Sequence, residues 1–223
     1  MSFRDRGQAG QELAAALAGY KNQRVVVLAL PRGGVPVAAE IAAALCAPLD
    51  LVLVRKVGLP QQPELAMGAV VDGAEPLVVR NEDVIAAAGI GHEEFDSICA
   101  DELAEIERRR RRYLGGGARI DVTGRIAIVV DDGIATGATT RAALRATRRR
   151  QPTKLVLAVP VAPTESLAAM RQEADEVVCL EDHELFGAIG HYYGDFHQIS
   201  DAEVVTTLAR FAEQRPDSAH SAA

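Results

Sequence analysis

One stretch decides the fold: Ile128-Val129-Val130-Asp131-Asp132-Gly133-Ile134-Ala135-Thr136-Gly137-Ala138-Thr139-Thr140. Its branched apolar start predicts a strand buried on both faces, and its small residues predict a turn that opens a helix at about Ala138. Gly, Ala and Thr let backbone N–H groups approach a phosphate closely, and the following helix N-terminus adds free donors and partial positive charge. The adjacent carboxylates of Asp131 and Asp132 would repel a phosphate, so we expect them to accept hydrogen bonds from sugar hydroxyls or to approach a metal.

The rest of the chain alternates apolar runs with helical patterns, which predicts an α/β fold with a mostly parallel, twisted sheet and helices on both faces. We expect strands at 25–30, 49–54, 126–130, 155–159 and 177–180, a shorter one at 77–79, and helices at 35–46, 138–149 and 165–174. In such folds, ligands bind beyond the carboxyl ends of the strands, at a switch point in strand order.

Two stretches interrupt this alternation. Residues 55–75 are rich in Gly, Pro and Gln, which predicts a long functional loop without a regular element. Residues 93–114 form a long polar helix pattern that glycines close, and we interpret about 81–119 as a helical insertion. We expect one domain over residues 1–214 and a disordered tail over 215–223.

Composition limits the classes of partner and compartment. The 223 residues are 48% hydrophobic and carry a formal net charge of −7, so the chain can bury a full core but has no global field that attracts nucleic acid. Cys46, Cys99 and Cys179 lie far apart and indicate neither a disulfide framework nor a zinc site. Charges fill the first residues, where a signal peptide needs an apolar stretch, and no segment approaches the roughly 18 apolar residues of a membrane span. We therefore expect a cytoplasmic protein that binds neither nucleic acid nor membrane.

The stretch from Ile128 to Thr140 resembles the signature of the type I phosphoribosyltransferases, which has four apolar residues, two acids and a T-G-x-T loop. The resemblance implies a C-terminal hood-like segment, here at about 181–211. It also implies that Asp131 and Asp132 hold the ribose hydroxyls of 5-phosphoribosyl-1-pyrophosphate and approach Mg²⁺, directly or through water. The 5-phosphate of this donor would be wrapped by Ala135, Thr136, Gly137, Ala138 and Thr139.

Two other loops are similar to parts of the same family. The turn Pro31-Arg32-Gly33-Gly34 follows the first predicted strand and looks like the family's pyrophosphate loop, in which main-chain amides and a basic side chain meet the leaving group. Lys56 begins a stretch that is similar to the mobile loop that closes over the site. The resemblance thus implies that Arg32, Lys56, Asp131 and Asp132 carry the reaction, with Gly33 and Gly34 in the donor site.

The acceptor is not readable from the phosphate loop. Members that act on 6-oxopurines usually have an aspartate before T-G to exchange a proton with the base, whereas this chain has Ala135, as adenine-type members do. Phe186 and Tyr192 belong to an aromatic-rich stretch that serves either as a stacking platform for a base or as a hydrophobic seam. The five arginines of 108–112 follow acidic helical turns, so we interpret them as part of a solvated or intersubunit helix, which leaves a homodimer open.

Together these features predict a Mg²⁺-dependent transferase that moves phosphoribose from the donor to a nitrogenous acceptor, such as a purine-like base, and releases pyrophosphate. The alternative is a non-catalytic module of the same fold that senses the donor or a nucleotide. Retention of Arg32 and Lys56 favours the enzyme, because a sensor needs no clamp on a leaving group. A Rossmann-type oxidoreductase is disfavoured, because no G-x-G-x-x-G turn follows the first strand.

Overall fold

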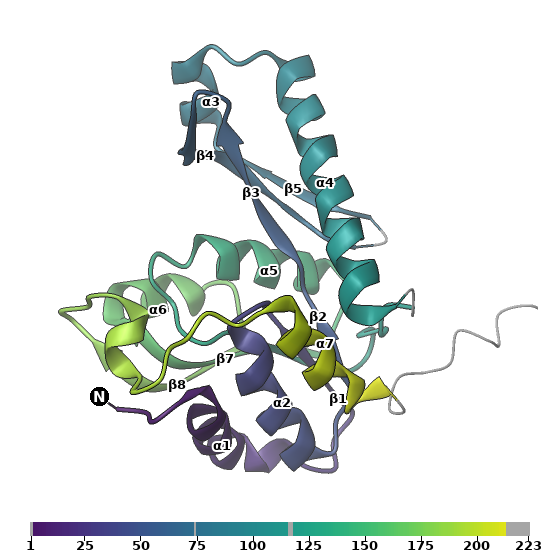
Figure 1. Ribbon diagram of the computed structural model, residues 1–223, viewed down its shortest axis with the longest axis vertical. Helices are drawn as coiled ribbons and strands as arrows, with labels where there is room; N and C mark the ends of the chain where they lie inside the picture. The colour runs from purple at the N-terminus through teal and green to yellow at the C-terminus, as the bar shows by residue number, and fades with distance from the viewer. Residues whose placement is uncertain (1, 74, 116–117, 213–223) are drawn as a thin grey trace, which may run out of the picture.

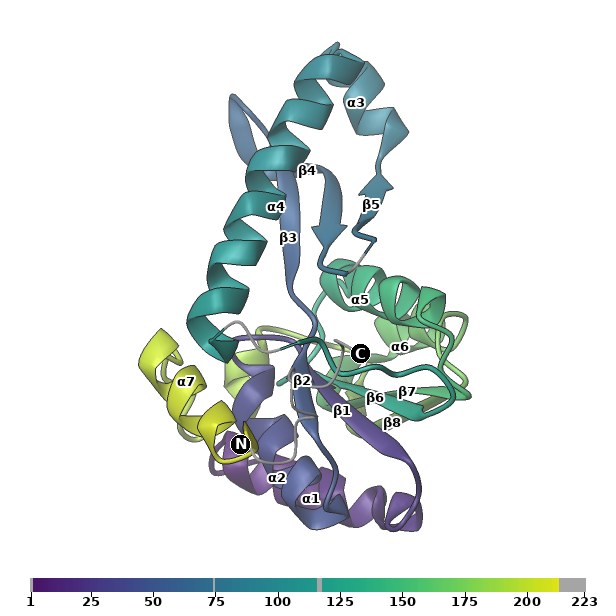
Figure 2. The same ribbon diagram turned by 90° about the vertical axis from the view of Figure 1, so that its right-hand side faces the viewer.

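The computed structural model describes residues 2–73, 75–115 and 118–212, which form a sheet-based core and a projecting lobe (Figures 1 and 2). The tail predicted at 215–223 lies outside the described residues. In the part of the chain that is described, no helix is both long enough and apolar enough to cross a membrane.

The core is a five-stranded sheet in which every neighbouring pair of strands is parallel. In the order β2-β1-β6-β7-β8, its strands are Leu49–Leu51, Val25–Ala29, Ile126–Val130, Lys154–Pro163 and Glu176–His183. Alternate residues of β1 enter different apolar clusters: Val27 shares one with Ile41, and Leu28 shares the other with Ala143. Burial on both faces explains the continuous apolar runs and confirms the α/β fold that they predict.

Helices cover both faces of this sheet (Figure 1). The helices α1 (Arg6–Ala16), α2 (Gly34–Leu45) and α7 (Asp201–Ala209) contribute to one apolar cluster, and α5 (Ala138–Arg149) and α6 (Thr164–Met170) to the other. The chain leaves β1 toward α2 on one face, and it leaves the neighbouring strand β6 toward α5 on the opposite face. The carboxyl ends of β1 and β6 therefore form the kind of switch point at which α/β sheets bind ligands. Short 3-10 helices lie at Ala18–Tyr20 and Ile189–Tyr192.

The projecting lobe combines an antiparallel sheet with two helices (Figure 2). Its elements are β3 (Val54–Leu59), β4 (Gln62–Val71), β5 (Leu77–Arg80), α3 (Glu82–Ala88) and α4 (His92–Leu114). Phe95 and Ile106 of α4 share an apolar cluster with Val57 and Met67 of the sheet. The insertion predicted as helical is thus joined by strands, and the strand expected at 77–79 belongs to this lobe instead of the main sheet.

The loop predicted for residues 55–75 is wrong, because most of this range forms the β3–β4 hairpin. Its glycines permit close approach of backbones instead of breaking the strands. A Cβ added to Gly58 would overlap the carbonyl oxygen of Pro63, and one added to Gly68 would overlap that of Val79. The register of the hairpin shifts on either side of Gly58, and such an irregularity tolerates a proline within a strand.

Arg110 of α4 joins the lobe to the core through a buried ion network. Its Nη1 binds Asp72 Oδ2 at 2.9 Å, and its Nη2 lies 3.3 Å from both carboxylate oxygens of Asp50 on β2. Only 5% of the Arg110 side chain is exposed. The other arginines of the run also pair within the chain: Arg108 and Arg109 with Glu105, Arg111 with Glu107, and Arg112 with Asp201. The run is thus ion-paired within the chain, with Arg110 buried, and the interpretation of the helix as solvated or intersubunit stays a prediction.

Candidate functional site

The loops that follow β1 and β6 pack against each other at the switch point. The backbone N–H of Leu30 donates to the carbonyl oxygen of Val130 at 2.9 Å, and a Cβ added to Gly34 would lie 2.7 Å from that same oxygen. A Cβ added to Gly33 would overlap the carboxylate of Asp132. The turn predicted to bind pyrophosphate and the predicted acid pair therefore lie side by side, and glycine at positions 33 and 34 permits their contact.

Asp132 is held by an arginine that the sequence analysis does not single out. Arg6, the first residue of α1, places both its Nε and its Nη2 2.8 Å from Asp132 Oδ2. The side chains of Arg6 and Asp132 are only 8% and 12% exposed. The hydroxyl of Tyr193 donates to the backbone carbonyl of Asp132 at 2.6 Å, so both the side chain and the backbone of Asp132 are fixed. A lone arginine carries no local signal of this contact, whose partners are 126 positions apart.

Asp131 has a different environment from its neighbour. Its Oδ1 accepts a hydrogen bond from the backbone N–H of Asp132 at 2.9 Å. Burial of the carboxyl, followed by the negative charge of Asp132, raises the pKa of Asp131 well above its usual range. The two adjacent acids are thus unequal, because Asp132 pairs with a cation whereas the pKa of Asp131 is raised.

The small-residue loop before α5 is open to solvent. Ala135, Thr136, Ala138 and Thr139 are exposed, whereas Gly137 is buried and has a φ of 75°, a left-handed conformation that favours glycine. Gly137 occupies the cap position of α5, so the unpaired N–H groups of the first helical turn lie beside the exposed loop. An anion could therefore reach these donors without displacing another element.

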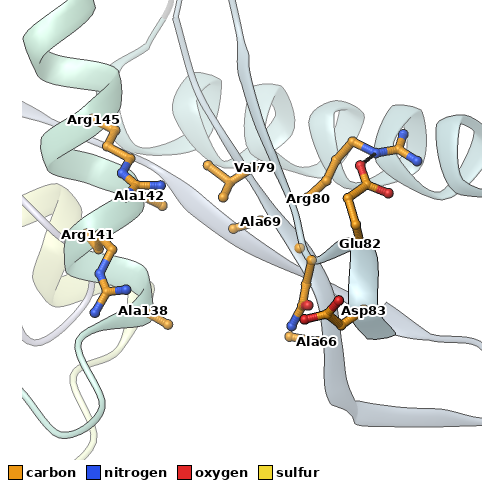
Figure 3. A pocket seen from close by; sticks show the side chains of 12 residues that line it. Ala66, Ala69, Val79, Arg80, Glu82, Asp83, Ala138, Arg141, Ala142 and Arg145 are labelled. Carbon is orange, nitrogen blue, oxygen red and sulfur yellow. Dashed lines mark hydrogen bonds and ion pairs between the residues drawn. The ribbon is translucent and has the colours of Figure 1, made fainter. Parts of the chain in front are cut away.

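A groove of about 470 Å³ begins at this loop and runs between α5 and the lobe (Figure 3). Arg141 and Arg145 project from α5 on one side, and Ala69 and Val79 of the lobe sheet lie on the other. The Nε of Arg141 is buried and has no hydrogen-bond partner among the residues that the structure describes. Ala138 belongs to the loop and also lines the groove. The groove therefore opens beside the predicted phosphate site, on the side of the lobe.

The two basic residues predicted for catalysis have partners other than the acid pair. Lys56 lies on β3, where its Nζ binds Glu64 Oε2 at 3.1 Å, and 44% of its side chain is exposed. Arg32 directly precedes the glycines of its turn, and its Nη1 lies 3.9 Å from Asp201 Oδ1 at the start of α7. Within the described ranges, neither basic side chain forms an ion pair with the two acids. The structure thus brings the Arg32 turn to the acids but leaves Lys56 on the lobe.

The aromatic residues after β8 lie beside the loop of the acid pair. The rings of Phe186 and Tyr192 are stacked with centroids 5.0 Å apart, and both residues are half-buried. Tyr193 is instead fully buried, in a seam with residues from the N-terminal segment. A Cβ added to Gly133 would lie 2.7 Å from Ile189 Cγ2, which shows how closely this segment covers the loop. The stretch therefore contains both a seam and partly exposed rings, and stacking of a base on Phe186 or Tyr192 stays a prediction.

Comparisons with known proteins agree with these features. A family model of the phosphoribosyl transferase domain matches residues 4–193. Two proteins named "Putative phosphoribosyl transferase", from the CDC 1551 and H37Rv strains of Mycobacterium tuberculosis, are each 50% identical to this chain over 208 residues. These matches cover 93% of this chain and 46% of each relative, so the chain spans less than half the length of the two proteins.

A solved structure agrees with the fold. The crystal structure of TT1426 from Thermus thermophilus is similar to this chain with a TM-score of 0.80 and 40% sequence identity. That similarity covers 95% of this chain and 100% of the other. Since the family model matches most of the chain, including the acid pair, its loop and the glycine turn, the chain belongs to the phosphoribosyl transferase domain family.

Proposed function

We propose that this chain transfers phosphoribose from 5-phosphoribosyl-1-pyrophosphate to a nitrogenous acceptor, with a purine-like base as the first class to test. One observation carries the proposal: the acid pair, the glycine turn at 33–34 and the exposed loop at 135–139 converge at the switch point between β1 and β6. The donor has a ribose between two phosphate-bearing ends. A site for this donor therefore needs hydrogen-bond acceptors for the ribose hydroxyls and, on either side of them, turns with free backbone N–H groups for the phosphates.

Each group has one task in this assignment. The loop at 135–139 binds the 5-phosphate through backbone N–H groups, Asp131 and Asp132 accept hydrogen bonds from the ribose hydroxyls, and the turn at 32–34 holds the pyrophosphate. The acceptor nitrogen forms its bond to the anomeric carbon as the bond from that carbon to pyrophosphate breaks. Groups fixed around the leaving oxygens stabilise the charge that develops there. Ala135 has no group that takes a proton, so the acceptor's proton passes to another group or to water.

The residues present fit Mg²⁺ that binds together with the donor. Across the described parts of the chain, no group of three or more His, Cys, Asp or Glu side chains could hold a metal ion. Mg²⁺ commonly binds through one or two carboxylates, substrate phosphates and water, and Asp131 and Asp132 offer carboxylates for this arrangement. When bound, the ion would neutralise negative charge on the departing pyrophosphate. We therefore propose that Mg²⁺ binds together with the donor, and that the protein does so in the cytoplasm.

A non-catalytic sensor of the donor or of a nucleotide is the second candidate. Its support is the position of Lys56, which binds Glu64 on the lobe, so that the clamp expected around a leaving group is not assembled. Exposed ion pairs of this kind contribute about 0–1 kcal/mol, and a bound pyrophosphate would readily take the place of Glu64. The enzyme stays the first candidate, because the exchange of this weak partner for a more highly charged one is what closure of the lobe requires.

Pyrophosphate release separates these candidates. The protein is incubated with donor, Mg²⁺ and a panel of purine and pyrimidine bases, and calorimetry with donor and Mg²⁺ is run in parallel. We expect release that depends on one class of acceptor and stops when the acceptor or Mg²⁺ is omitted. Donor binding without release by any base would favour the sensor, and absence of donor binding would contradict the enzyme and a sensor of the donor, leaving only a sensor of a nucleotide.

Gly33→Ala is expected to weaken donor binding, because the extra methyl group must displace the Asp132 carboxylate, and overpacking of this kind usually costs about 1–3 kcal/mol. The backbone at Gly33 has a φ of −60° and a ψ of −36°, which alanine adopts without strain, so the effect arises from overlap with the Asp132 carboxylate. Calorimetry with donor and Mg²⁺ measures it. Gly19→Ala is the matched control, because a Cβ there would meet nothing within 4 Å. Equal donor affinity of the two variants would show that the acid pair does not depend on the turn.

Donor and Mg²⁺ together are expected to slow backbone hydrogen exchange across residues 55–75. The hairpin lines the groove beside the phosphate loop, and Lys56 gains a strongly charged partner only when pyrophosphate is bound. Lys56→Gln should abolish the added protection. Lys21→Gln, at an exposed position outside the lobe, should preserve it. High protection in the free protein that saturating donor leaves unchanged would show that the lobe does not close.

A further inference from the structure

Arg6 is a heavily contacted charged side chain at the edge of the candidate site. Its Nε and Nη2 both bind Asp132 Oδ2 at 2.8 Å, and its Nη1 donates to the carbonyl oxygen of His197 at 2.9 Å. The guanidinium also stacks over the ring of Phe196, 3.9 Å from its centroid. Three of the five N–H donors are thereby engaged, and the plane of the group is fixed on one face by the ring.

We propose that Arg6 is a positioning residue for the ribose of the donor, which holds Asp132 by one oxygen so that the other remains for a sugar hydroxyl. This inference rests on the proposed function. An arginine that only tied two elements together would form its strongest pair as a fork on both carboxylate oxygens. Here both donors converge on Oδ2, and Oδ1 takes no part in the pair with Arg6.

The segment that fixes Arg6 also fixes the backbone of Asp132. Phe3 and Tyr193 form a parallel bridge, and the backbone N–H of Gly194 donates to the carbonyl oxygen of Phe3 at 2.8 Å. From this pair of segments, the Tyr193 hydroxyl donates a hydrogen bond to the carbonyl oxygen of Asp132. The N-terminal segment and the segment after β8 therefore converge on one acid of the pair and hold it from its side chain and from its main chain.

Charge gives Arg6 a second consequence for the donor. Two adjacent acids lie where a ligand with phosphates at both ends would arrive, and like charges at such distances repel strongly when they are shielded from water. A cation at Oδ2 offsets this repulsion without approaching the phosphates through the open loop. Loss of this offset acts on the phosphates of any ligand, whereas loss of the positioned Asp132 oxygen acts only on a ligand that has a ribose, so removal of Arg6 should weaken the donor far more than pyrophosphate.

The test compares two ligands by calorimetry with Mg²⁺: the donor, which carries the ribose, and inorganic pyrophosphate, which lacks it. We expect Arg6→Met to weaken the donor at least about tenfold and to change pyrophosphate affinity less than about twofold. Arg6→Lys, which keeps the charge but loses the paired donors, should fall between wild type and Arg6→Met. Arg4→Met, which removes an exposed arginine two positions earlier, should bind both ligands as the wild type does.

A double-mutant comparison checks that the effect passes through Asp132. Once Asp132→Asn is present, adding Arg6→Met should change donor affinity less than about twofold, because the residue that Arg6 positions has already lost its charge. Full additivity, or an equal loss of donor and pyrophosphate affinity in Arg6→Met, would overturn the inference in favour of a purely structural role. If Arg6→Met does not fold, the same two comparisons with Arg6→Lys decide. Donor binding by the wild type and by the Arg6 variants alike would refute the inference alone, whereas no donor binding by the wild type would refute it together with the proposed function.

Discussion

Replacement of Asp131 and Asp132 together by asparagine is expected to lower the affinity for donor with Mg²⁺ by at least about two orders of magnitude. Hydrogen bonds to charged groups contribute about 1.5–3 kcal/mol each, and about 1.4 kcal/mol corresponds to a factor of ten in affinity. Asparagine preserves side-chain size and one acceptor oxygen, so the change removes charge and leaves the packing. Calorimetry measures the loss, with Asp101→Asn on an exposed position of α4 as the control. Affinity within about twofold of wild type would refute the ribose role of the pair.

The two single variants are expected to differ in the free energy of unfolding. Asp132→Asn removes the charge that pairs with the buried Arg6, which costs about 1–3 kcal/mol. The pKa of Asp131 is raised by burial and by Asp132, so neutral asparagine resembles the protonated acid. An acid with a raised pKa binds its proton more tightly in the folded state, so stability falls as pH rises above the unfolded value near about 3.9. Asp131→Asn should reduce that fall, and denaturant unfolding at two pH values tests this sign.

Arg110→Ala is expected to lower the free energy of unfolding by about 3–5 kcal/mol, the typical cost of removing one partner from a buried ion pair. The Arg110 guanidinium lies between the carboxylates of Asp50 and Asp72, and its loss removes the buried cation that the two acids share, leaving Asp72 with the more exposed Arg119. Because the network joins the lobe to the core, near-ultraviolet circular dichroism should also show changed packing at their junction.

The neighbouring arginine provides the control for this prediction. Arg111 belongs to the same run, but its side chain is 75% exposed and lies 3.9 Å from Glu107. Arg111→Ala should therefore change the free energy of unfolding by no more than about 0.5 kcal/mol. Guanidinium chloride denaturation of both variants supplies the comparison. A similar small effect of both substitutions would show that the buried network contributes no net stability.

The segment around the acid pair was predictable because local and tertiary preferences agree there. The strand expected at 126–130 and the helix expected at 138–149 coincide with β6 and α5 at both ends. A strand between two others has both faces buried, so its apolar run is unbroken, and Gly137 supplies the left-handed turn that starts the helix. Each of these signals is contained in the segment itself.

The lobe was not predictable in the same way, because glycines and prolines interrupt the apolar runs of its strands. Glycine and proline are usually read as breakers, which assigns a loop to residues 55–75. In the structure, Gly58 faces the backbone of Pro63 and Gly68 faces that of Val79, and no local pattern marks these glycines as parts of paired strands. The place of Lys56 on β3 follows from this hairpin, so its distance from the acid pair could not be read from the sequence either.

The candidate site was partly predictable for a related reason. Parallel neighbours bring their carboxyl ends to one edge, so adjacency of the glycine turn and the acids follows once β1 and β6 are paired. No comparable rule of strand pairing predicts the contact between Arg6 and Asp132. It depends on a helix at the start of the chain that packs across the core, and one charged residue in that helix differs in no visible way from a solvated one.

The contacts of Arg6 also determine when, during synthesis, the site can be completed. The residue whose carbonyl it binds lies 191 positions later in the chain. At translation rates of about 5–20 residues per second, roughly 10–40 s pass between the synthesis of the two partners. The strands β1 and β6 can pair on the ribosome before that time. The contacts around Asp132 are complete only when the segment that carries Tyr193 and His197 has been synthesised. The complete arrangement is therefore a late event of folding, and a nascent chain that stops short of residue 193 lacks the contacts that Tyr193 makes with Asp132 and that the His197 carbonyl makes with Arg6.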